Sequence, residues 1–446
     1  MSNVPMSNPE MMITCVEPFA LSRGACIQLK SGRVVACSGS GFGYSDDAGL
    51  TWCEPYEGVY GNGEKPKLMN LVELDGGALG ATQIHAYPGA PATYHRQIYF
   101  TVTQDLGRTW SDPRAMSPVR LPMLTFQNAM IRTSRGRIIQ PIYTAIGQGS
   151  YHSEEDRFPG GYIDGEWVGT DAHYYDTHFC AAMVLYSDDD GRTWQANRNG
   201  EMLISTDDGH LHSVAEPSVV EVEPGKLLMF LRTVIGRAYQ SWSYDDGETW
   251  TRPLPTHLAS SNAPVILDRL PATGHLLVVW NQAGEDEIKQ GYVRSRLSAA
   301  VSRNGGGVWE FYQNVESAHE QRQVYPGPIR PIRPQGEYAV HAGLAAFEND
   351  TRYEAEMIPH GRWTNHTVCA LEDRVLIAYS GQCKVLPLKW FYRGRDPHAQ
   401  NPMFTKYQAQ MPPCYLPEPP PSLPVSDAER ALSGFFKSDP PDSSSG

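Results

Sequence analysis

The chain has 446 residues and a net charge of −13; 41% of its residues are hydrophobic and 20% are charged. No run of Lys or Arg is longer than two residues, so the sequence does not indicate the basic surface that nucleic acids or anionic membranes require. No segment approaches the roughly 18 apolar residues that span a bilayer. The start, MSNVPMSNPEMMITC, has no basic leader and no apolar stretch. We therefore expect a cytoplasmic protein, or a secreted one if the chain is a processed form.

The eight cysteines are scattered and form no Cys-x-x-Cys pair. Zinc sites and redox motifs usually show such spacing, so the sequence signals neither. We expect free, mostly buried thiols, and neither a metal nor another cofactor.

One pattern, Ser/Thr-x-Asp-x-Gly-x-x-Trp, recurs along the chain. It begins at residues 45, 103, 187 and 243, and a fifth copy at Ser302 has Asn304 in place of Asp. Such a segment forms a tight hairpin turn, because the Ser and Asp side chains bond the backbone and Gly adopts a conformation that other residues resist. Intervals of 58, 84, 56 and 59 residues indicate repeated supersecondary units such as propeller blades.

A second motif keeps the same period, with two apolar strands separated by a turn. It occupies residues 26–36, 70–80, 129–141, 218–230, 265–279 and 367–379. The Asp-containing turn follows each of the first five hairpins, so one unit holds four short strands, the content of a blade. We predict an all-β, six-bladed propeller over residues 1–410, able to stand as a monomer, with an insertion at about 146–180. The Pro-rich residues 411–446 are predicted to form a mostly disordered tail.

These turns, known as Asp boxes, and the inner hairpins resemble those of the sialidase superfamily over roughly residues 15–390. The resemblance implies a glycosidase that cleaves a terminal acidic sugar, sialic acid or a relative. It also implies that the Asp boxes lie away from the ligand and that their acids are structural. Three arginines would bind the substrate carboxylate, since the planar guanidinium donates paired, charge-assisted hydrogen bonds.

The fourth unit matches the family's pattern of a Glu followed by an Arg. Glu216-Pro217 opens its hairpin and Arg232 ends it. Arg294, before the fifth box, fits the place of another family Arg, and Arg296 would share its strand face. Arg23 takes the place of the remaining one, although Gly-Ala replaces the apolar-Pro pair that follows it in the family. The alternatives without a binding role are a surface ion pair for Glu216 and Arg232, and a turn residue for Arg23.

The family's nucleophile is a Tyr activated by a Glu, because a carboxylate nucleophile would be repelled by the substrate's own carboxylate. Tyr325, in Gln-Val-Tyr-Pro, lies at the matching distance after Arg294, and Glu216 would activate it. Tyr379 is the alternative, although its place at a strand end suits packing better.

The family's acid/base Asp has no counterpart, because residues 37–44 read Cys-Ser-Gly-Ser-Gly-Phe-Gly-Tyr. A glycosidase needs a proton donor for the leaving oxygen. Candidate pocket residues therefore come from other loops: His85 in the second unit, Asp171 and His173 in the insertion, and His212 just before Glu216. The pair His210 and His212 would lie on one side of an extended segment, but no third metal ligand is indicated.

Two other functions remain open. A uronate polysaccharide lyase would use an Arg to neutralise the carboxylate and a His/Tyr pair to remove the adjacent proton. A non-catalytic glycan-binding propeller would use the arginines for binding alone. In each case the expected partner is an acidic carbohydrate, not a nucleic acid or a membrane.

Overall fold

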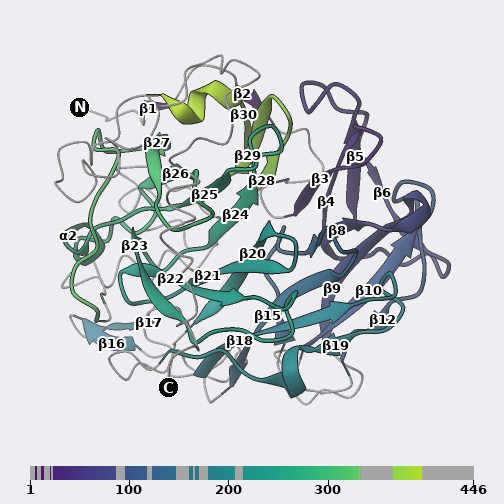
Figure 1. Cartoon of the computed structure of the whole chain (residues 1–446), viewed down its shortest axis with the longest axis horizontal. Coiled ribbons are helices and arrows are strands. Elements are labelled where there is room, and N and C mark those ends of the chain that lie inside the picture. The colour runs from purple at the N-terminus through teal and green to yellow at the C-terminus, as the bar shows by residue number, and fades with distance from the viewer. Residues whose placement is uncertain are drawn as a thin grey trace, which may run out of the picture.

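The computed structural model describes residues 6–7, 12–14, 21, 24–86, 96–117, 123–146, 160–163, 166–169, 179–205, 214–330, 332 and 365–393. Its sheets follow one another around a ring (Figure 1). The first three blades, from the inside outward, are β3 (Ala25–Gln28), β4 (Val34–Ser38), β5 (Gly41–Ser45) and β6 (Tyr56–Glu57); β8 (Leu68–Glu73), β9 (Leu79–Ala86), β10 (Arg96–Thr103) and β12 (Arg114–Ala115); and β13 (Met123–Leu124) and β14 (Ile131–Arg132) against β15 (Ile138–Ile146), β18 (Phe179–Ser187) and β19 (Gln195–Ala196).

The last three blades continue the same antiparallel order. They are β20 (Ala215–Glu223), β21 (Lys226–Arg232), β22 (Arg237–Ser243) and β23 (Leu254–Ala259); β24 (Val265–Arg269), β25 (Leu276–Asn281), β26 (Arg296–Ser302) and β27 (Glu310–Ser317); and β28 (His366–Ala370), β29 (Arg374–Tyr379) and β30 (Gln382–Pro387). The prediction of an all-β, six-bladed propeller is confirmed.

Short elements join these sheets. A helix, α2 (Glu285–Lys289), follows β25, and 3-10 turns occupy η2 (Asp75–Gly77), η3 (Asn197–Gly200) and η5 (Leu388–Tyr392). The strands β7 (Val59–Tyr60) and β11 (Thr109–Trp110) pair in parallel and so link the first blade to the second. Within the predicted insertion, the described residues form a separate ribbon of β16 (Gly160–Ile163) and β17 (Glu166–Gly169).

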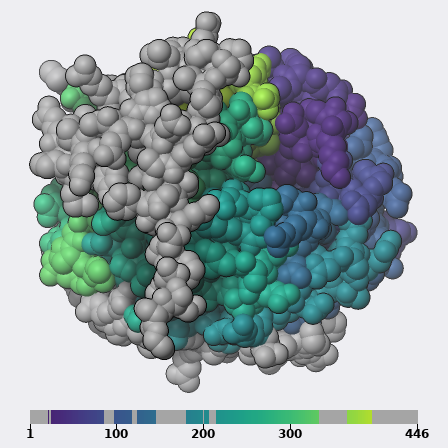
Figure 2. Space-filling view, viewed as in Figure 1, coloured from purple at the N-terminus to yellow at the C-terminus, as the bar shows by residue number. Residues whose placement is uncertain are grey.

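The N-terminal strands complete the last two blades. The strand β2 (Met12–Thr14) pairs with β30 as the outer strand of the sixth blade, and β1 (Met6–Ser7) pairs with β27 of the fifth. The two ends of the ring are therefore joined by backbone hydrogen bonds, which removes an exposed sheet edge. Figure 2 shows the purple first blade directly beside the yellow-green residues of the sixth.

The core is divided among the seams between blades. Each pair of neighbouring blades shares at least one apolar cluster, as with Phe42 and Leu71 between the first and second blades or Phe230 and Trp280 between the fourth and fifth. The cluster between the sixth and first blades contains Cys26 and Cys369. The described cysteines are thiols, and all but the partly exposed Cys53 are buried, as expected.

The Asp boxes lie between the third and fourth strands of the first five blades. In the second, the Thr103 hydroxyl donates to Asp105 at 2.8 Å, and Asp105 accepts the Thr109 amide and hydroxyl at 2.9 and 2.7 Å. Gly107 has a φ of 84°, the left-handed region that favours glycine, and Trp110 donates to its carbonyl at 3.0 Å. The acids of the boxes therefore hold turns, at the ends of the blades where the inner strands finish.

Candidate functional site

The candidate site lies at the other end of the blades, where the inner strands begin. Glu216 sits at a bulge in β20, because Ala215 is opposite Arg232 whereas Ser218 is opposite Phe230. Its φ is 41°, a conformation that costs about 1–3 kcal/mol in a residue other than glycine, and Pro217 restricts it further. The surrounding contacts must hold this strained backbone, as they often do at functional sites.

An ion pair supplies such a contact. Nη1 of Arg232, the last residue of β21, donates to Oε2 of Glu216 at 2.6 Å, and its Nε donates to Oδ1 of Asn262 at 2.8 Å. The side chains of Arg232 and Glu216 are only 4% and 12% exposed. A pair this deeply buried is not an incidental surface contact, since removing one partner would leave an uncompensated buried charge. The surface-pair alternative for these two residues is therefore wrong.

The charges of Arg294 and Glu216 both shift the pKa of a third group, His366, which is the first residue of β28. Burial lowers the pKa of His366 to about 4; the Arg294 charge lowers it further, while the hydrogen bond to Val279 and the Glu216 carboxylate raise it. His366 is fully buried and its Nε2 lies 2.7 Å from the Val279 carbonyl oxygen. Glu216, Arg232 and Arg294, chosen from the sequence, are thus brought to one region of the ring, together with a histidine.

Arg296 is separated from Arg294 by its partners. It is 1% exposed and donates to both oxygens of Glu287 in α2, at 2.8 and 2.7 Å. The expectation that both arginines share one strand face is wrong, because β26 begins at Arg296 and Arg294 lies in the turn before it. Arg296 therefore holds α2 in place, and Arg294 remains the candidate for ligand binding.

The two tyrosines differ in exposure. Tyr325 is 57% exposed and lies beside Val324, whose amide donates to Oε1 of Gln282 at 2.7 Å. Tyr379 is fully buried and donates to Oε1 of Glu316 at 2.6 Å. The Tyr379 hydroxyl is thus bonded within the protein, which suits a packing role, whereas Tyr325 is accessible. No tyrosine hydroxyl of the described residues hydrogen-bonds to Glu216, so the role of Tyr325 stays a prediction.

The other candidates are only partly described. His85 lies near the end of β9, at the same end of the blades as Glu216, with its ring edge-on to Tyr99 at 5.7 Å between centroids. Burial, and to a lesser extent the Lys67 charge, lowers the pKa of His85. Arg23, Asp171, His173 and His212 lie outside the described residues. Residues 38–41 form the tight turn between β4 and β5, so that stretch supplies no acid/base.

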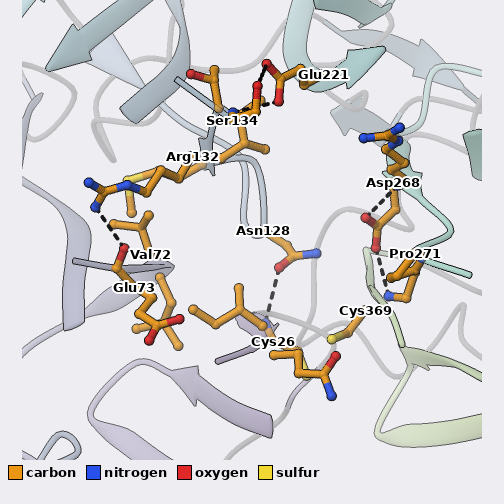
Figure 3. Close-up of a pocket in the computed structure, with 18 of the residues that line it drawn as sticks. Cys26, Val72, Glu73, Asn128, Arg132, Ser134, Glu221, Asp268, Pro271 and Cys369 are labelled. Carbon is orange, nitrogen blue, oxygen red and sulfur yellow. Dashed lines mark hydrogen bonds between the residues drawn. The ribbon is translucent and has the colours of Figure 1, made fainter. Parts of the chain in front are cut away.

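A cavity of about 840 Å³ opens at the opposite end, lined by residues from the inner strands of all six blades. Figure 3 shows Asn128 pointing into this opening, where it accepts from the Cys26 amide at 3.1 Å and donates to the Val368 carbonyl at 2.5 Å. The carboxylates that line the cavity accept hydrogen bonds from backbone amides of neighbouring blades: Glu73 from Lys30, Glu221 from Ser134 and Asp268 from Ala370. These charges hold the ring together.

In the part of the chain that the structure describes, no helix is long and apolar enough to cross a membrane. Among the same residues, no three His, Cys, Asp or Glu side chains are placed to hold a metal ion.

The fold and the repeated turns define an Asp-box propeller. A model of the BNR repeat-like domain matches residues 45–335, and the chain belongs to this family. The chain is similar to the solved Hadza microbial sialidase Hz136, at 15% identity and a TM-score of 0.53, covering 82% of this chain and 65% of that one. It is also similar to the NanB sialidase from Streptococcus pneumoniae, at 13% identity and a TM-score of 0.50, covering 87% and 72%. At such low identity, the structural similarity shows a shared, sialidase-like fold and nothing finer.

Sequence analysis did not single out His366, Asn281 or Ser261, which all lie near the Arg232 end of the blades. Asn281 ends β25 and Ser261 lies just before β24. The available signal was position: His366 is the first residue of the apolar strand β28, as Glu216 is the second residue of β20. A polar residue at the start of a buried inner strand marks a candidate position that residue type alone does not reveal.

Proposed function

We propose that this propeller is a sialidase-like exo-glycoside hydrolase that cleaves a terminal acidic sugar, sialic acid or a related 2-keto acid. The observation that carries the proposal is the buried Glu216–Arg232 pair on a strained bulge. The charge of Arg294 reaches the same place, because it and Glu216 both shift the pKa of His366. A guanidinium held by Glu216 and Asn262 is fixed in orientation, which is what binding a planar carboxylate requires. The similarity to solved sialidases supports the proposal at the level of fold.

The finer proposal concerns the bond that breaks. The Tyr325 oxygen attacks the anomeric carbon, the glycosidic bond breaks, and its electron pair leaves with the aglycone oxygen, which takes a proton from solvent water. Water then displaces the tyrosine and gives a product of retained configuration. Glu216 would accept the tyrosine proton, and the exposed Tyr325 side chain is accessible for this role.

The first experiment is a fluorogenic screen of the purified full chain against N-acetylneuraminic acid and KDN glycosides. Uronate polymers are assayed in parallel by the ultraviolet absorbance of an unsaturated product. We expect release from a sialoside that is abolished by Arg232→Ala. Absorbance from a uronate polymer without sialoside release would instead support the lyase.

A trapping experiment tests the nucleophile. A 2,3-difluoro sugar acid should add its mass to the peptide that contains Tyr325, and Tyr325→Phe should prevent the adduct. An adduct on another residue would contradict this assignment while leaving the hydrolase proposal intact.

A glycan-binding propeller is the second candidate, and one contact favours it. The Glu216 carboxylate is already bonded to Arg232, so it is arranged as an orienting group for an arginine rather than as a free base. Silence in both assays, together with calorimetric binding of a sialoside that Arg232→Ala abolishes, would establish binding without turnover.

A further inference from the structure

Polar atoms without hydrogen-bond partners gather near the Arg232 end of the blades. Both side-chain atoms of Asn281, Oγ of Ser261 and Nδ1 of His366 have no partner, although Asn281 and His366 are 0% exposed and Ser261 is 1% exposed. A buried polar atom left unsatisfied costs about 1–3 kcal/mol, so a cluster of them calls for an explanation.

Backbone contacts tie these three residues together. The Ser261 amide donates to the Asn281 carbonyl at 3.3 Å, and Nε2 of His366 lies 2.7 Å from the carbonyl of Val279, two residues before Asn281. Asn262, next to Ser261, accepts from Nε of Arg232 at 2.8 Å. The cluster therefore adjoins the arginine that we assign to the substrate carboxylate.

The chemistry of the cluster is neutral. Because the Val279 carbonyl can only accept, Nε2 of His366 carries the proton and Nδ1 presents a lone pair. Burial keeps the pKa of His366 at about 4, so the ring is uncharged at neutral pH. Asn281 adds a donor and an acceptor, and Ser261 a hydroxyl. Such a set suits hydroxyl and amide groups, not a second anion.

Asn70 shows what a structural asparagine looks like in this fold. It is also 0% exposed, but Oδ1 accepts from the amides of Ala129 and Met130 at 2.6 and 3.2 Å, and Nδ2 donates to Thr82 at 2.9 Å. Both the oxygen and the nitrogen of its amide are bonded to the protein. The amide of Asn281, at equal burial, is not used by the protein at all.

We infer that Asn281, Ser261 and His366 form a neutral subsite that binds the hydroxyl and amide groups of the sugar acid whose carboxylate Arg232 binds. The inference rests on the proposed function, because the arginine and the neutral subsite are assigned to one ligand. Asn281 would determine specificity, because its amide would bind a ligand with a hydroxyl or N-acyl group more tightly than a ligand with an apolar group at that position.

The test compares affinity with stability in the full-length protein. Calorimetry measures binding of 2-deoxy-2,3-didehydro-N-acetylneuraminic acid, and thermal unfolding without ligand gives the Tm. Asn281→Leu should weaken binding about 10-fold, the value of one or two hydrogen bonds, and raise the Tm, because it removes unsatisfied groups at nearly constant shape. The matched control Asn70→Leu should lower the Tm, because it breaks bonds that the protein makes.

Ser261→Ala is the second variant, since it deletes a single oxygen and should fold whatever happens to Asn281→Leu. We expect it to weaken binding several-fold with no loss of Tm. Unchanged affinity in both variants, with binding abolished by Arg232→Ala, would overturn the neutral subsite and leave the proposed function standing. A fall in Tm for Asn281→Leu as large as that of Asn70→Leu would assign Asn281 to the scaffold. If the wild-type protein does not bind the probe, the proposed function and the inference both fail.

Discussion

Arginine serves two purposes in this propeller, and its partners decide which. Arg296 gives its guanidinium to both oxygens of Glu287 and so secures α2. Arg232 is held by Glu216 and Asn262 at the end of β21. The charges of Glu216 and Arg294 both affect the pKa of His366. Arg296 and Arg232 are both almost fully buried, so burial alone does not distinguish an arginine that binds ligand from one that supports the scaffold.

This difference gives a prediction at the scale of the residue. Arg232→Lys keeps the charge but loses the planar fork, so it should weaken sugar-acid binding about 10-fold to 100-fold. The control Arg296→Lys should lower the Tm by loss of the two-bond contact with Glu287, and leave the affinity of the folded protein unchanged. Calorimetry on both variants measures this, and equal affinity for wild type and Arg232→Lys would remove Arg232 from the carboxylate site.

The sequence allowed a prediction of the charged half of the site but not of the neutral half. Glu216 and Arg232 flank a hairpin at a recognisable spacing, and charge makes such residues conspicuous. Asn281 and Ser261 are small polar residues in buried surroundings, and what marks them is the lack of a partner. That property exists only once the blades are packed, so no local pattern in the chain reveals it.

At the scale of the element, the Asp box is the unit that the sequence specifies best. Each interaction in it joins residues at most four apart, as when Gly107 donates its amide to the Thr103 hydroxyl at 2.9 Å. Because the contacts are local, the pattern predicts the turn without knowledge of the rest. Packing against the neighbouring blade is not local: a Cβ on Gly107 would lie 2.6 Å from the ring of Phe42.

Gly107→Ala should therefore destabilise the protein by two mechanisms at once. The left-handed φ of 84° costs about 1 kcal/mol in alanine, and the clash with Phe42 adds about 1–3 kcal/mol. Gly32→Ala is the matched control, because its φ is 89° but a Cβ there would meet nothing within 4 Å. Urea unfolding should show a clearly larger loss for Gly107→Ala, and equal losses would mean that the Phe42 contact is not tight.

At the scale of the whole molecule, six seams and a closed ring replace a single core. The repeats predicted six units, and each unit now shares an apolar cluster with the next, including the sixth with the first. The closing strands β1 and β2 were not predicted, because two or three residues are too short for any periodic signal. Their pairing with β27 and β30 is decided by the free edges of those blades.

The carboxyl groups of the Asp boxes lead to a prediction about how the stability of the folded protein depends on pH. Hydrogen bonds from Thr51 lower the pKa of Asp47 to about 2, and in three other boxes similar bonds outweigh burial, so the pKa values of Asp105, Asp189 and Asp245 are also lowered. A carboxyl with a lowered pKa in the folded state stabilises above its unfolded pKa near 4. That stability is lost as the pH falls from about 4 to 2, and Asn304 in the fifth box cannot contribute.

Two buried groups act in opposite directions at milder pH. Burial lowers the pKa of His366 to about 4, so unfolding, which restores a pKa near 6.5, takes up a proton and is favoured as the pH falls between those values. Burial raises the pKa of Asp268 to about 6, so the folded state takes up the proton first and gains stability over much of the same range. The two effects oppose each other between pH 6 and 4, so each offsets part of the other in the wild-type free energy of unfolding.

Single variants separate the two groups. In His366→Gln, the loss of stability caused by His366 is removed, so the free energy of unfolding should rise relative to that of the wild type as the pH is lowered from 6 to 4. In Asp268→Asn, the His366 effect is left alone, and the free energy should fall over the same range, by at most about 3 kcal/mol. Both variants should still lose stability below pH 4, since the Asp boxes are intact. Urea unfolding at intervals of pH measures these slopes, and parallel curves for the three proteins would show that neither buried group titrates as its environment requires.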